Sequence, residues 1–315
     1  MAHIYATFRC EPSCARCQSC HPQRWPECTP DELRTVLGRL RGLDVIKMLG
    51  GDPFAREDID DVVRTVKAEV RPYIFQLNTT GDHPERVLEV VSNHGWPRLH
   101  LRVSMEGWRI GHDARRSPGS FSRMRRTVEG LAALRERVDF SLGVNYHVHD
   151  ASLQDLWRAR LWCQSLGVGF FPGIPVKPVL FREEPHTLAR TGLPLTDLDA
   201  YRRQADGRRR PGGYRVLEAL FLGRTDAQLL DRLVAEGPNL RFDCQELRSL
   251  AYVLPNGDVV ACGLRTQTVG NLREQTLEHI WRSPQAAAAR RGVDSCMGCY
   301  QASVQLMSRL YGGRP

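Results

Sequence analysis

Lysine is scarce in this sequence. Only three of the 44 basic residues are lysine, so arginine carries nearly all of the positive charge, and the formal net charge is +8 at pH 7. A basic protein can attract phosphate-rich partners. The arginines are, however, spread over nearly every segment and are not gathered with aromatic residues into one stripe. This distribution favours solvent-exposed arginines over nucleic-acid binding, and we expect no nucleic-acid partner.

Long apolar segments are also lacking. No apolar run approaches the roughly 20 residues that a membrane-spanning helix needs, and the first residues lack the charged and apolar regions of a secretory signal. We therefore expect a cytoplasmic protein with no membrane partner. In that reducing compartment, the ten cysteines are expected to be metal ligands or reactive thiols rather than disulfides.

Three of the cysteines are closely spaced. Cys10, Cys14 and Cys17 form a C-x3-C-x2-C loop directly after residues 3–8, an apolar run that predicts a strand. Three thiolates can hold a 4Fe-4S cluster while one iron has no protein ligand, and that iron can bind a substrate or cofactor. On this motif alone, a structural zinc site or unrelated reduced thiols are the alternatives.

Apolar runs alternate with amphipathic runs up to about residue 180, a pattern typical of strand–helix repeats and a parallel sheet. The predicted strands are residues 3–8, 44–49, 73–78, 99–104, 140–146 and 168–171. The predicted helices begin near residues 30, 59, 84, 121 and 153, the first of them with a capping box in Thr29-Pro30-Asp31-Glu32. With a chain of 315 residues, this pattern predicts an α/β fold: an open, partial (β/α)6 barrel of the TIM type. The loops after its strands would meet at one face, which is where barrel enzymes keep their sites.

Polar or glycine-containing segments follow several of these strands. They are Gly50-Gly51-Asp52-Pro53, Asn78-Thr79-Thr80-Gly81, Ser104-Met105-Glu106-Gly107, and Asn145 with His147 and His149. Paired glycines let a ligand approach the backbone closely, and proline fixes the path that leaves the turn. A plain turn is the alternative for the first segment. We expect all of these segments to lie at the same face as the cysteine loop.

The last quarter of the chain has a different character. Residues 251–254 and 259–262 are apolar and are joined by an Asn-Gly turn, which predicts a β-hairpin, and a helix is expected around residues 276–282. Four cysteines lie in this part: Cys244, Cys262, Cys296 and Cys299. Four thiolates are a complete ligand set for one more metal centre, for which tetrahedral zinc is the alternative to an iron–sulfur cluster. We predict three regions: a barrel over 1–180, a helical bridge over 181–240 and a small hairpin and helix domain over 241–315.

The two cysteine motifs, in this order, resemble those of radical SAM enzymes with a twitch domain, the shortened relative of the SPASM extension. Arg16 stands where the family usually has an aromatic residue, and Asp52 replaces the Glu of a GGEP segment. The resemblance implies S-adenosylmethionine (SAM) bound to the open iron of a first 4Fe-4S cluster. It also implies one auxiliary 4Fe-4S cluster with four protein ligands, and cleavage of SAM to methionine and a 5'-deoxyadenosyl radical.

The resemblance also implies a set of SAM contacts. The segment Gly50, Gly51, Asp52 and Pro53 would receive the SAM amino group. The methionine or ribose would be touched by Asn78, Ser104, Glu106 and Asn145. Arg116, within a loop that runs from His112 to Phe121, would pair with the SAM carboxylate; a surface loop with a helix cap is the alternative for this segment.

The sequence motifs indicate the cofactors more narrowly than they indicate the reaction. Our lead hypothesis is oxidation or epimerisation of an amino-sugar or aminocyclitol-like small molecule. It depends on the single auxiliary cluster, the lack of an evident N-terminal peptide-recognition domain, and polar groups at strand ends. The candidate catalytic residues are Glu106, His147 and Lys177. We also expect Cys20 and Cys28 just beyond the cluster loop at the open face, as possible hydrogen-atom donors, fourth ligands or idle thiols. Cys163, on the apolar face of the predicted helix from residue 153, is expected to be a core residue. A flavodoxin or ferredoxin would supply electrons. The alternatives are a maturase of ribosomal peptides and a zinc-stabilised binding protein without catalysis.

Overall fold

The fold is built on one nine-stranded sheet with the strand order β6-β5-β4-β3-β2-β1-β7-β8-β9. The computed structural model describes residues 1–10, 26–147, 153–173, 244–262 and 265–294. The strands are β1 (Ala2–Thr7), β2 (Val45–Gly50), β3 (Ile74–Thr79), β4 (Leu99–Met105), β5 (Ser141–His147), β6 (Gly169–Gly173), β7 (Ala251–Val253), β8 (Asp258–Cys262) and β9 (Arg265–Asn271). Strands β1 to β6 are all parallel and lie in chain order, which confirms the six-unit α/β prediction.

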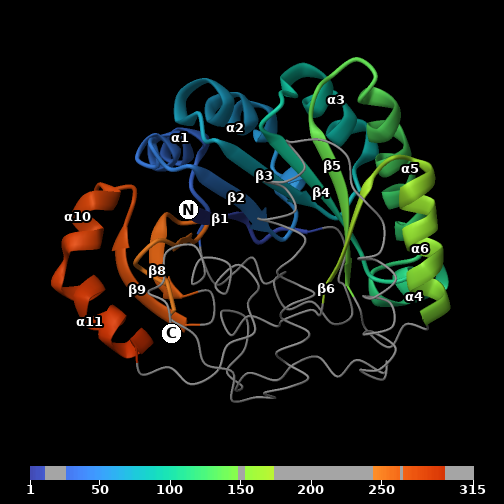
Figure 1. Ribbon diagram of the computed structural model, residues 1–315. Helices are drawn as coiled ribbons and strands as arrows, with labels where there is room; N and C mark the ends of the chain where they lie inside the picture. Colours follow the sequence, from blue (N-terminus) through green and yellow to red (C-terminus); the bar gives the residue numbers. More distant parts are fainter. Residues whose placement is uncertain (11–25, 148–152, 174–243, 263–264, 295–315) are drawn as a thin grey trace.

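Helices cover one face of this sheet (Figure 1). They are α1 (Pro30–Gly38), α2 (Ile59–Thr65) with a π-helical turn (Val66–Val70), α3 (Pro84–His94), α4 (Ile110–Arg115), α5 (Ser120–Leu134), α6 (Leu153–Ser165), α10 (Leu277–Arg282) and α11 (Pro284–Asp294), with a short 3-10 turn at Pro53–Ala55. Helices α1, α2, α3, α5 and α6 lie outside the parallel strands, and α10 and α11 lie outside β8 and β9. None of the helices in the described ranges is long and apolar enough to cross a membrane.

The start of α1 shows how local sequence fixes an element. Thr29 Oγ1 accepts a hydrogen bond from the Glu32 amide, and Glu32 Oε2 accepts one from the Thr29 amide, 2.9 Å away. Pro30 occupies the first helical position, where no amide donor is needed. This reciprocal capping box is the one predicted from Thr29-Pro30-Asp31-Glu32.

Two apolar clusters lie on opposite faces of the sheet. The larger one fills the space between the strands and the helices: Leu101 and Val103 of β4, for example, join Met124 and Val128 of α5 in it. Cys163 of α6 is also fully buried there, and burial raises the pKa of its thiol to about 12, which confirms it as a core residue. The smaller cluster lies on the inner face, opposite the helices, and is formed by Tyr5, Phe8, Leu250, Tyr252, Leu254 and Val260.

The inner face of the parallel strands carries buried polar side chains. Arg102 of β4 is 1% exposed, and its guanidinium carbon lies 4.2 Å from the centroid of the Phe171 ring. That ring in turn lies over two glycines, because a Cβ atom on Gly143 or Gly169 would be 2.5 or 2.8 Å from its atoms. The sequence analysis did not identify this stack, since neither Arg102 nor Phe171 lies at a strand end in a recognisable motif.

The C-terminal strands join the main sheet. The predicted hairpin is present as β7 and β8, which pair antiparallel, but β7 also pairs in parallel with β1, with Ala2 opposite Ala251. A third strand, β9, and a second helix, α11, extend this part beyond the predicted hairpin and helix. Tyr252 and the inner-face cluster provide the apolar contact that places β7 beside β1. Residues 181–240, predicted as a helical bridge, lie outside the described residues.

Candidate functional site

The ends of the parallel strands bring most of the described candidate residues to one edge of the sheet. Cys10 follows β1, the Gly50 to Pro53 segment ends and follows β2, Thr79 and Thr80 end β3, Glu106 follows β4 and His147 ends β5. Because parallel strands all point the same way, their carboxyl ends meet at this edge. The topology therefore assembles the predicted face. Cys14, Cys17, Cys20, His149, Lys177, Cys296 and Cys299 lie outside the described residues.

Gly50 and Gly51 hold the backbone that leads into the cysteine loop. The Gly51 amide donates to Thr7 O and the Asp52 amide to Arg9 O, both at 2.8 Å. A Cβ atom on Gly51 would lie 2.1 Å from Arg9 O, and one on Gly50 would lie 2.1 Å from Thr7 O. Only glycine permits this approach, because a contact that short with backbone cannot be relieved by a rotamer change. The end of β2 therefore needs glycine at both positions to pack against the backbone of Thr7 and Arg9, just before Cys10.

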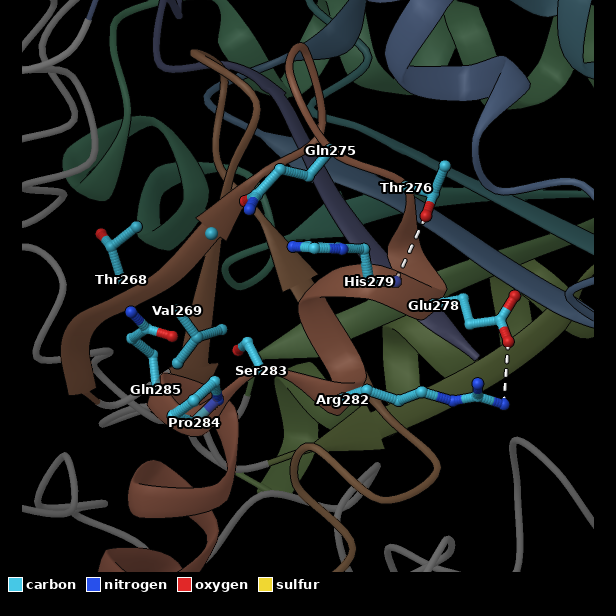
Figure 2. Close-up of a pocket in the computed structure, with 11 residues that line it drawn as sticks. Thr268, Val269, Gln275, Thr276, Glu278, His279, Arg282, Ser283, Pro284 and Gln285 are labelled. Atoms are coloured by element: carbon cyan, nitrogen blue, oxygen red, sulfur yellow. Dashed lines mark hydrogen bonds and ion pairs between the residues drawn. The ribbon is translucent and has the colours of Figure 1, made fainter.

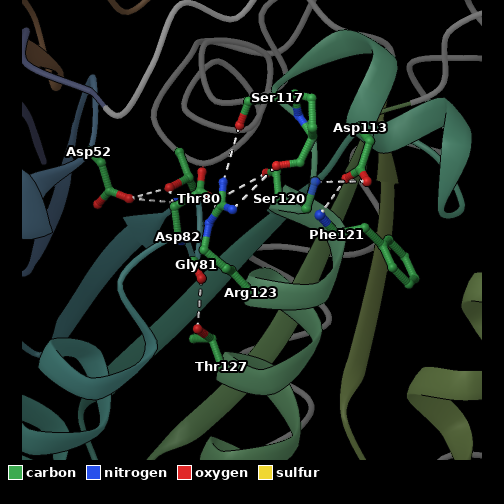
Figure 3. A network of polar contacts seen from close by, with 12 residues as sticks. Asp52, Thr80, Gly81, Asp82, Asp113, Ser117, Ser120, Phe121, Arg123 and Thr127 are labelled. Carbon is green, nitrogen blue, oxygen red and sulfur yellow. Dashed lines mark hydrogen bonds and ion pairs between the residues drawn. The ribbon is translucent and has the colours of Figure 1, made fainter.

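Asp52 joins the ends of β2 and β3. Its Oδ1 accepts a hydrogen bond from the Phe54 amide at 3.0 Å, and its Oδ2 accepts from the Thr79 hydroxyl and the Thr80 amide, both at 2.9 Å. The side chain is fully buried. Figure 3 shows Asp52 pointing toward Thr80. The Thr80 hydroxyl also donates to Oδ2, so this short carboxylate satisfies four donors inside the fold.

Glu27 and Arg56 bind the backbone just before Cys10. Glu27 Oε1 accepts from the Thr7 hydroxyl and, at 3.3 Å, from the Phe8 amide, while Oε2 lies 2.9 Å from Arg9 Nη2. Arg56, 3% exposed, donates to Ala6 O at 3.0 Å and forms a two-point ion pair with Asp58, both contacts at 2.7 Å. The backbone before Cys10 is thus bound by side chains from two other segments of the chain. The sequence analysis missed these residues because ordinary charged side chains give no motif.

Glu106 is the centre of a charged group at the ends of β4 and β5. Its Oε1 atom lies 2.9 Å from Arg116 Nη2 and 2.8 Å from His147 Nδ1. The side chains of Glu106, Arg116 and His147 are 14%, 7% and 34% exposed, so the imidazole is the most accessible of the three. The structure therefore brings together three residues that the sequence analysis proposed separately.

Behind this group, His112 connects Glu106 to the loop after β3. The Glu106 amide donates to His112 Nδ1 at 3.1 Å, and His112 Nε2 lies 3.2 Å from Ser120 Oγ. Ser120 donates to Asp82 Oδ1 at 2.9 Å, and Arg123 Nε also contacts this oxygen at 3.2 Å. Figure 3 shows how Ser120 and Arg123 converge on Asp82 from α5. A buried polar chain thus links the ends of β3 and β4.

Asp113 fixes the adjacent turn into α5. Its two carboxylate oxygens accept from the Gly119 amide at 3.1 Å and from the Phe121 amide at 2.7 Å, as Figure 3 shows for Phe121. These are amides of the first turn of α5, which would otherwise have no partner within the helix. The structure thus gives Asp113 the capping role that the sequence analysis offered as the alternative for this segment, while Arg116 points to Glu106.

Three further predicted SAM contacts lie on β3, β4 and β5. Ser104 and Asn145 are register partners on neighbouring strands, and Asn145 is the register partner of Phe171 on β6. Asn78 is paired with Arg102, one step further from the strand ends, and its Oδ1 accepts from Gln76 Nε2 at 2.8 Å. All three are partly exposed. Their roles in binding remain predictions.

Cys28 lies elsewhere than expected. The sequence analysis placed it at the open face, but the residue is 3% exposed, belongs to the main core, and its amide donates to Pro255 O at 2.7 Å. Burial raises the pKa of its thiol to about 11. A buried thiol beside the β7–β8 turn packs as a small apolar group. The expected placement is therefore corrected, and we do not carry Cys28 forward as a hydrogen-atom donor.

Cys244 and Cys262 are brought to the same part of the C-terminal strands. Val260 pairs with Tyr252, so Cys262, two residues later on β8, reaches the level of Leu250. Glu246, two residues after Cys244, forms a bridge with that same Leu250. Cys244 also packs against the inner-face cluster, which lies between this site and the end of β1. The backbone thus places two of the four predicted auxiliary ligands on neighbouring segments.

One pocket lies away from these strand ends. It has a volume of about 700 Å³ and is lined by β9, α10 and α11, with Thr268, Gln275, Glu278, His279, Arg282 and Gln285 among its lining residues (Figure 2). Glu278 and Arg282 pair with each other at 2.9 Å across one turn of α10. None of the predicted site residues that the structure describes lines this pocket, and we do not assign it to the candidate site.

Comparison with known proteins identifies the C-terminal part and the fold. Residues 244–300 match the SPASM family, an iron–sulfur cluster-binding domain. Among solved structures, Streptococcus suis SuiB bound to precursor peptide SuiA is 14% identical with a TM-score of 0.65, covering 94% of this chain and 66% of SuiB. The enzyme anSMEcpe with bound AdoMet and the Cp18Cys peptide is 15% identical with a TM-score of 0.60, covering 91% of this chain and 81% of anSMEcpe. No curated protein matches the sequence.

These findings confirm the architecture that the two cysteine motifs predict. The chain has the fold of radical SAM enzymes and carries, at its C-terminal end, a match to an auxiliary iron–sulfur cluster domain. It spans about two thirds of the length of SuiB. At 14–15% identity these solved structures establish the fold of the chain, and they do not identify its substrate or reaction.

Proposed function

We propose that this protein is a radical SAM enzyme that oxidises or epimerises an amino-sugar or aminocyclitol-like small molecule. It would hold one 4Fe-4S cluster and SAM at the carboxyl ends of β1 to β5, and one auxiliary 4Fe-4S cluster at its C-terminal part. The observation that carries the proposal is the Glu106, Arg116 and His147 group, which lies at the ends of β4 and β5, on the same edge of the sheet as Cys10.

The described residues fit the two cofactors. Thiolates are the usual ligands of iron–sulfur clusters, and Cys10 lies directly after a strand whose end is fixed by Gly51 and Glu27. The remaining predicted ligands are Cys14 and Cys17 for the first cluster and Cys244, Cys262, Cys296 and Cys299 for the second. SuiB has also been solved bound to S-adenosylmethionine, and this chain shares its fold at a TM-score of 0.61. When bound, the cofactors would supply the 5'-deoxyadenosyl radical that removes a hydrogen atom from the substrate, and an acceptor for a second electron.

The protein's own contribution is to move a proton. If a hydrogen atom and an electron leave a carbinol carbon, the hydroxyl proton must also leave for a ketone to form. With His147 Nδ1 donating to Glu106, Nε2 is the ring nitrogen that accepts a proton. The Glu106 carboxylate stabilises the imidazolium that results, and Arg116 keeps that carboxylate in place. A protonated, partly exposed imidazole then passes its proton to solvent.

Incubation of the anaerobically reconstituted enzyme with SAM, dithionite and a panel of aminocyclitols and amino sugars tests the substrate class. The proposal predicts 5'-deoxyadenosine together with a ketone or an epimer from at least one member. Deuterium at the reacting carbon should move into 5'-deoxyadenosine. Turnover of a leader-bearing peptide with no turnover on any sugar or aminocyclitol would replace the lead substrate class.

Modification of a ribosomal peptide is the second candidate. SuiB and anSMEcpe, whose fold this chain shares, were each solved with a bound peptide. In this case the same cofactors would act on a peptide carbon, giving an epimer or a crosslink. A protein from another class, a zinc-stabilised binding protein, would be colourless, contain zinc without iron, and release no 5'-deoxyadenosine.

A further inference from the structure

The strongest unassigned feature is the imidazole of His112, which stands between Glu106 and Asp82. It is fully buried on α4, a helix of one and a half turns that follows the end of β4. The Glu106 amide can only donate, so His112 Nδ1 must accept this 3.1 Å hydrogen bond. The ring proton is therefore on Nε2, which donates to Ser120 Oγ at 3.2 Å.

The rest of the chain agrees with this direction. Because Ser120 Oγ accepts from His112, its own hydroxyl proton is available to Asp82 Oδ1 at 2.9 Å. Arg123 holds the same oxygen of Asp82 from α5. Every donor in this chain of hydrogen bonds, from the Glu106 amide to the Ser120 hydroxyl, thus has an acceptor. The chain ends on Asp82, in the loop after β3, which forms an ion pair with Arg123.

The environment keeps His112 neutral. Burial, followed by the positive charge of Arg116, lowers the pKa of its imidazole to about 4. A neutral ring with an unprotonated Nδ1 is the form that the Glu106 amide requires. The same Arg116 that pairs with Glu106 thus also favours the neutral imidazole that the Glu106 amide requires.

We propose that His112 is a positioning residue: it fixes the Glu106 backbone so that the carboxylate meets both Arg116 and His147 at the cofactor and substrate side of the sheet. This inference rests on the proposed function and deepens it, because it names the group that sets the geometry of that site. The alternative is that His112 merely fills space against Phe121, whose ring centroid lies 5.9 Å from that of the imidazole.

Two variants separate these roles. In His112→Asn the amide oxygen takes the place of Nδ1 and keeps the acceptor for the Glu106 amide, while the contact with Ser120 is lost. In His112→Gln the longer side chain reaches the place of Nε2 and keeps the contact with Ser120, while the acceptor for Glu106 is lost. Both remove the ring, so a space-filling role predicts the same loss in each.

The first measurement is the dissociation constant of SAM for the cluster-loaded enzymes by titration calorimetry, with thermal unfolding midpoints alongside. We expect His112→Asn to bind SAM within about threefold of the wild type and His112→Gln about tenfold or more weakly, since an unsatisfied buried amide is left behind. Equal affinities in the two variants, or losses that simply follow their unfolding midpoints, would overturn the proposal.

The second measurement does not depend on SAM. Hydrogen exchange at the Glu106 amide should be slow in the wild type and in His112→Asn and faster by about tenfold or more in His112→Gln. If the wild type fails to bind SAM but this exchange pattern holds, the proposed function fails while the positioning of Glu106 stands. If exchange is equally slow in all three proteins, His112 does not position Glu106.

Discussion

The Nδ1 atom of His147 lies 2.8 Å from Oε1 of Glu106, joining the ends of two neighbouring parallel strands. Arg116, the residue that follows α4, holds the same oxygen. One carboxylate oxygen thus contacts both the Arg116 guanidinium and the His147 imidazole, and the His147 side chain is about a third exposed. This arrangement suits a base that must face a substrate while its partner stays fixed.

Replacing that base should separate SAM cleavage from product formation. In His147→Gln we expect product to fall by about 100-fold or more, because general-base catalysis typically contributes 10²–10⁴-fold. Release of 5'-deoxyadenosine without product should persist. Both are quantified by liquid chromatography after a fixed time. His94→Gln, a change of a histidine on α3 that pairs with Asp60, is the control. If His147→Gln lost 5'-deoxyadenosine and substrate-derived product to the same extent, while His94→Gln lost neither, His147 would be assigned to SAM binding instead.

The close approach at Gly51 predicts a steric failure. In Gly51→Ala the new Cβ would lie 2.1 Å from Arg9 O. Overpacking of this kind costs about 1–3 kcal/mol or more, and the displaced backbone leads to Cys10, so we expect a lower free energy of unfolding and a reduced iron content. Gly38→Ala, where nothing lies within 4 Å of the new atom, should be neutral or slightly stabilising. The free energy of unfolding in urea and the iron content per chain are measured for both variants. Equal values for Gly51→Ala and Gly38→Ala would contradict this prediction.

The buried ion pair between Arg56 and Asp58 should contribute measurably to the free energy of unfolding. Arg56→Met leaves Asp58 and Glu27 without their shared cation next to the loop. Breaking one side of a buried pair costs about 3–5 kcal/mol. Arg64→Met, which removes an exposed ion pair with Asp61, should leave the unfolding free energy nearly unchanged. Equal unfolding free energies for the two variants would show that the buried Arg56 contacts do not stabilise the fold.

The buried imidazole of His112 predicts a loss of stability in acid. Its folded pKa of about 4 lies below its ordinary value of 6.5, so the unfolded chain binds the proton more tightly. The contribution of His112 to the free energy of unfolding is fully present above pH 6.5. It falls as the pH decreases from 6.5 toward 4, by roughly 3 kcal/mol. His3 adds a loss of the same sign, since burial lowers its pKa as well. Unfolding free energies at pH 7 and 4.5 should differ less in His112→Asn than in the wild type; an equal difference would contradict this assignment.

Local patterns of the sequence predicted the scaffold well. The capping box at Thr29 follows from a four-residue motif. The apolar faces of the helices and the six strands follow from short-range periodicity, which the parallel sheet preserves. Polar segments at strand ends could be grouped in advance because a parallel sheet places those ends together. The pairing of β7 with β1 could not, because contact between residues 2 and 251 depends on packing of Tyr252 against the inner face.

Contacts between distant side chains were the harder part of the site. Glu27 and Arg56 are ordinary charged residues, and only the fold shows that they bind the backbone before Cys10. Cys28 was expected at the open face because it is near the cysteine loop in sequence, but the chain turns it into the core. His112 was noted as part of a motif, yet its hydrogen bonds to Glu106 and Ser120 depend on tertiary geometry.

The most direct test of the account is iron and acid-labile sulfide per chain after anaerobic reconstitution, measured with 5'-deoxyadenosine release from SAM under dithionite. Two 4Fe-4S clusters predict about eight irons and eight sulfides per chain, together with 5'-deoxyadenosine. About four irons with 5'-deoxyadenosine would keep the first site and contradict the auxiliary cluster. A protein that holds no iron and cleaves no SAM would contradict the central claim.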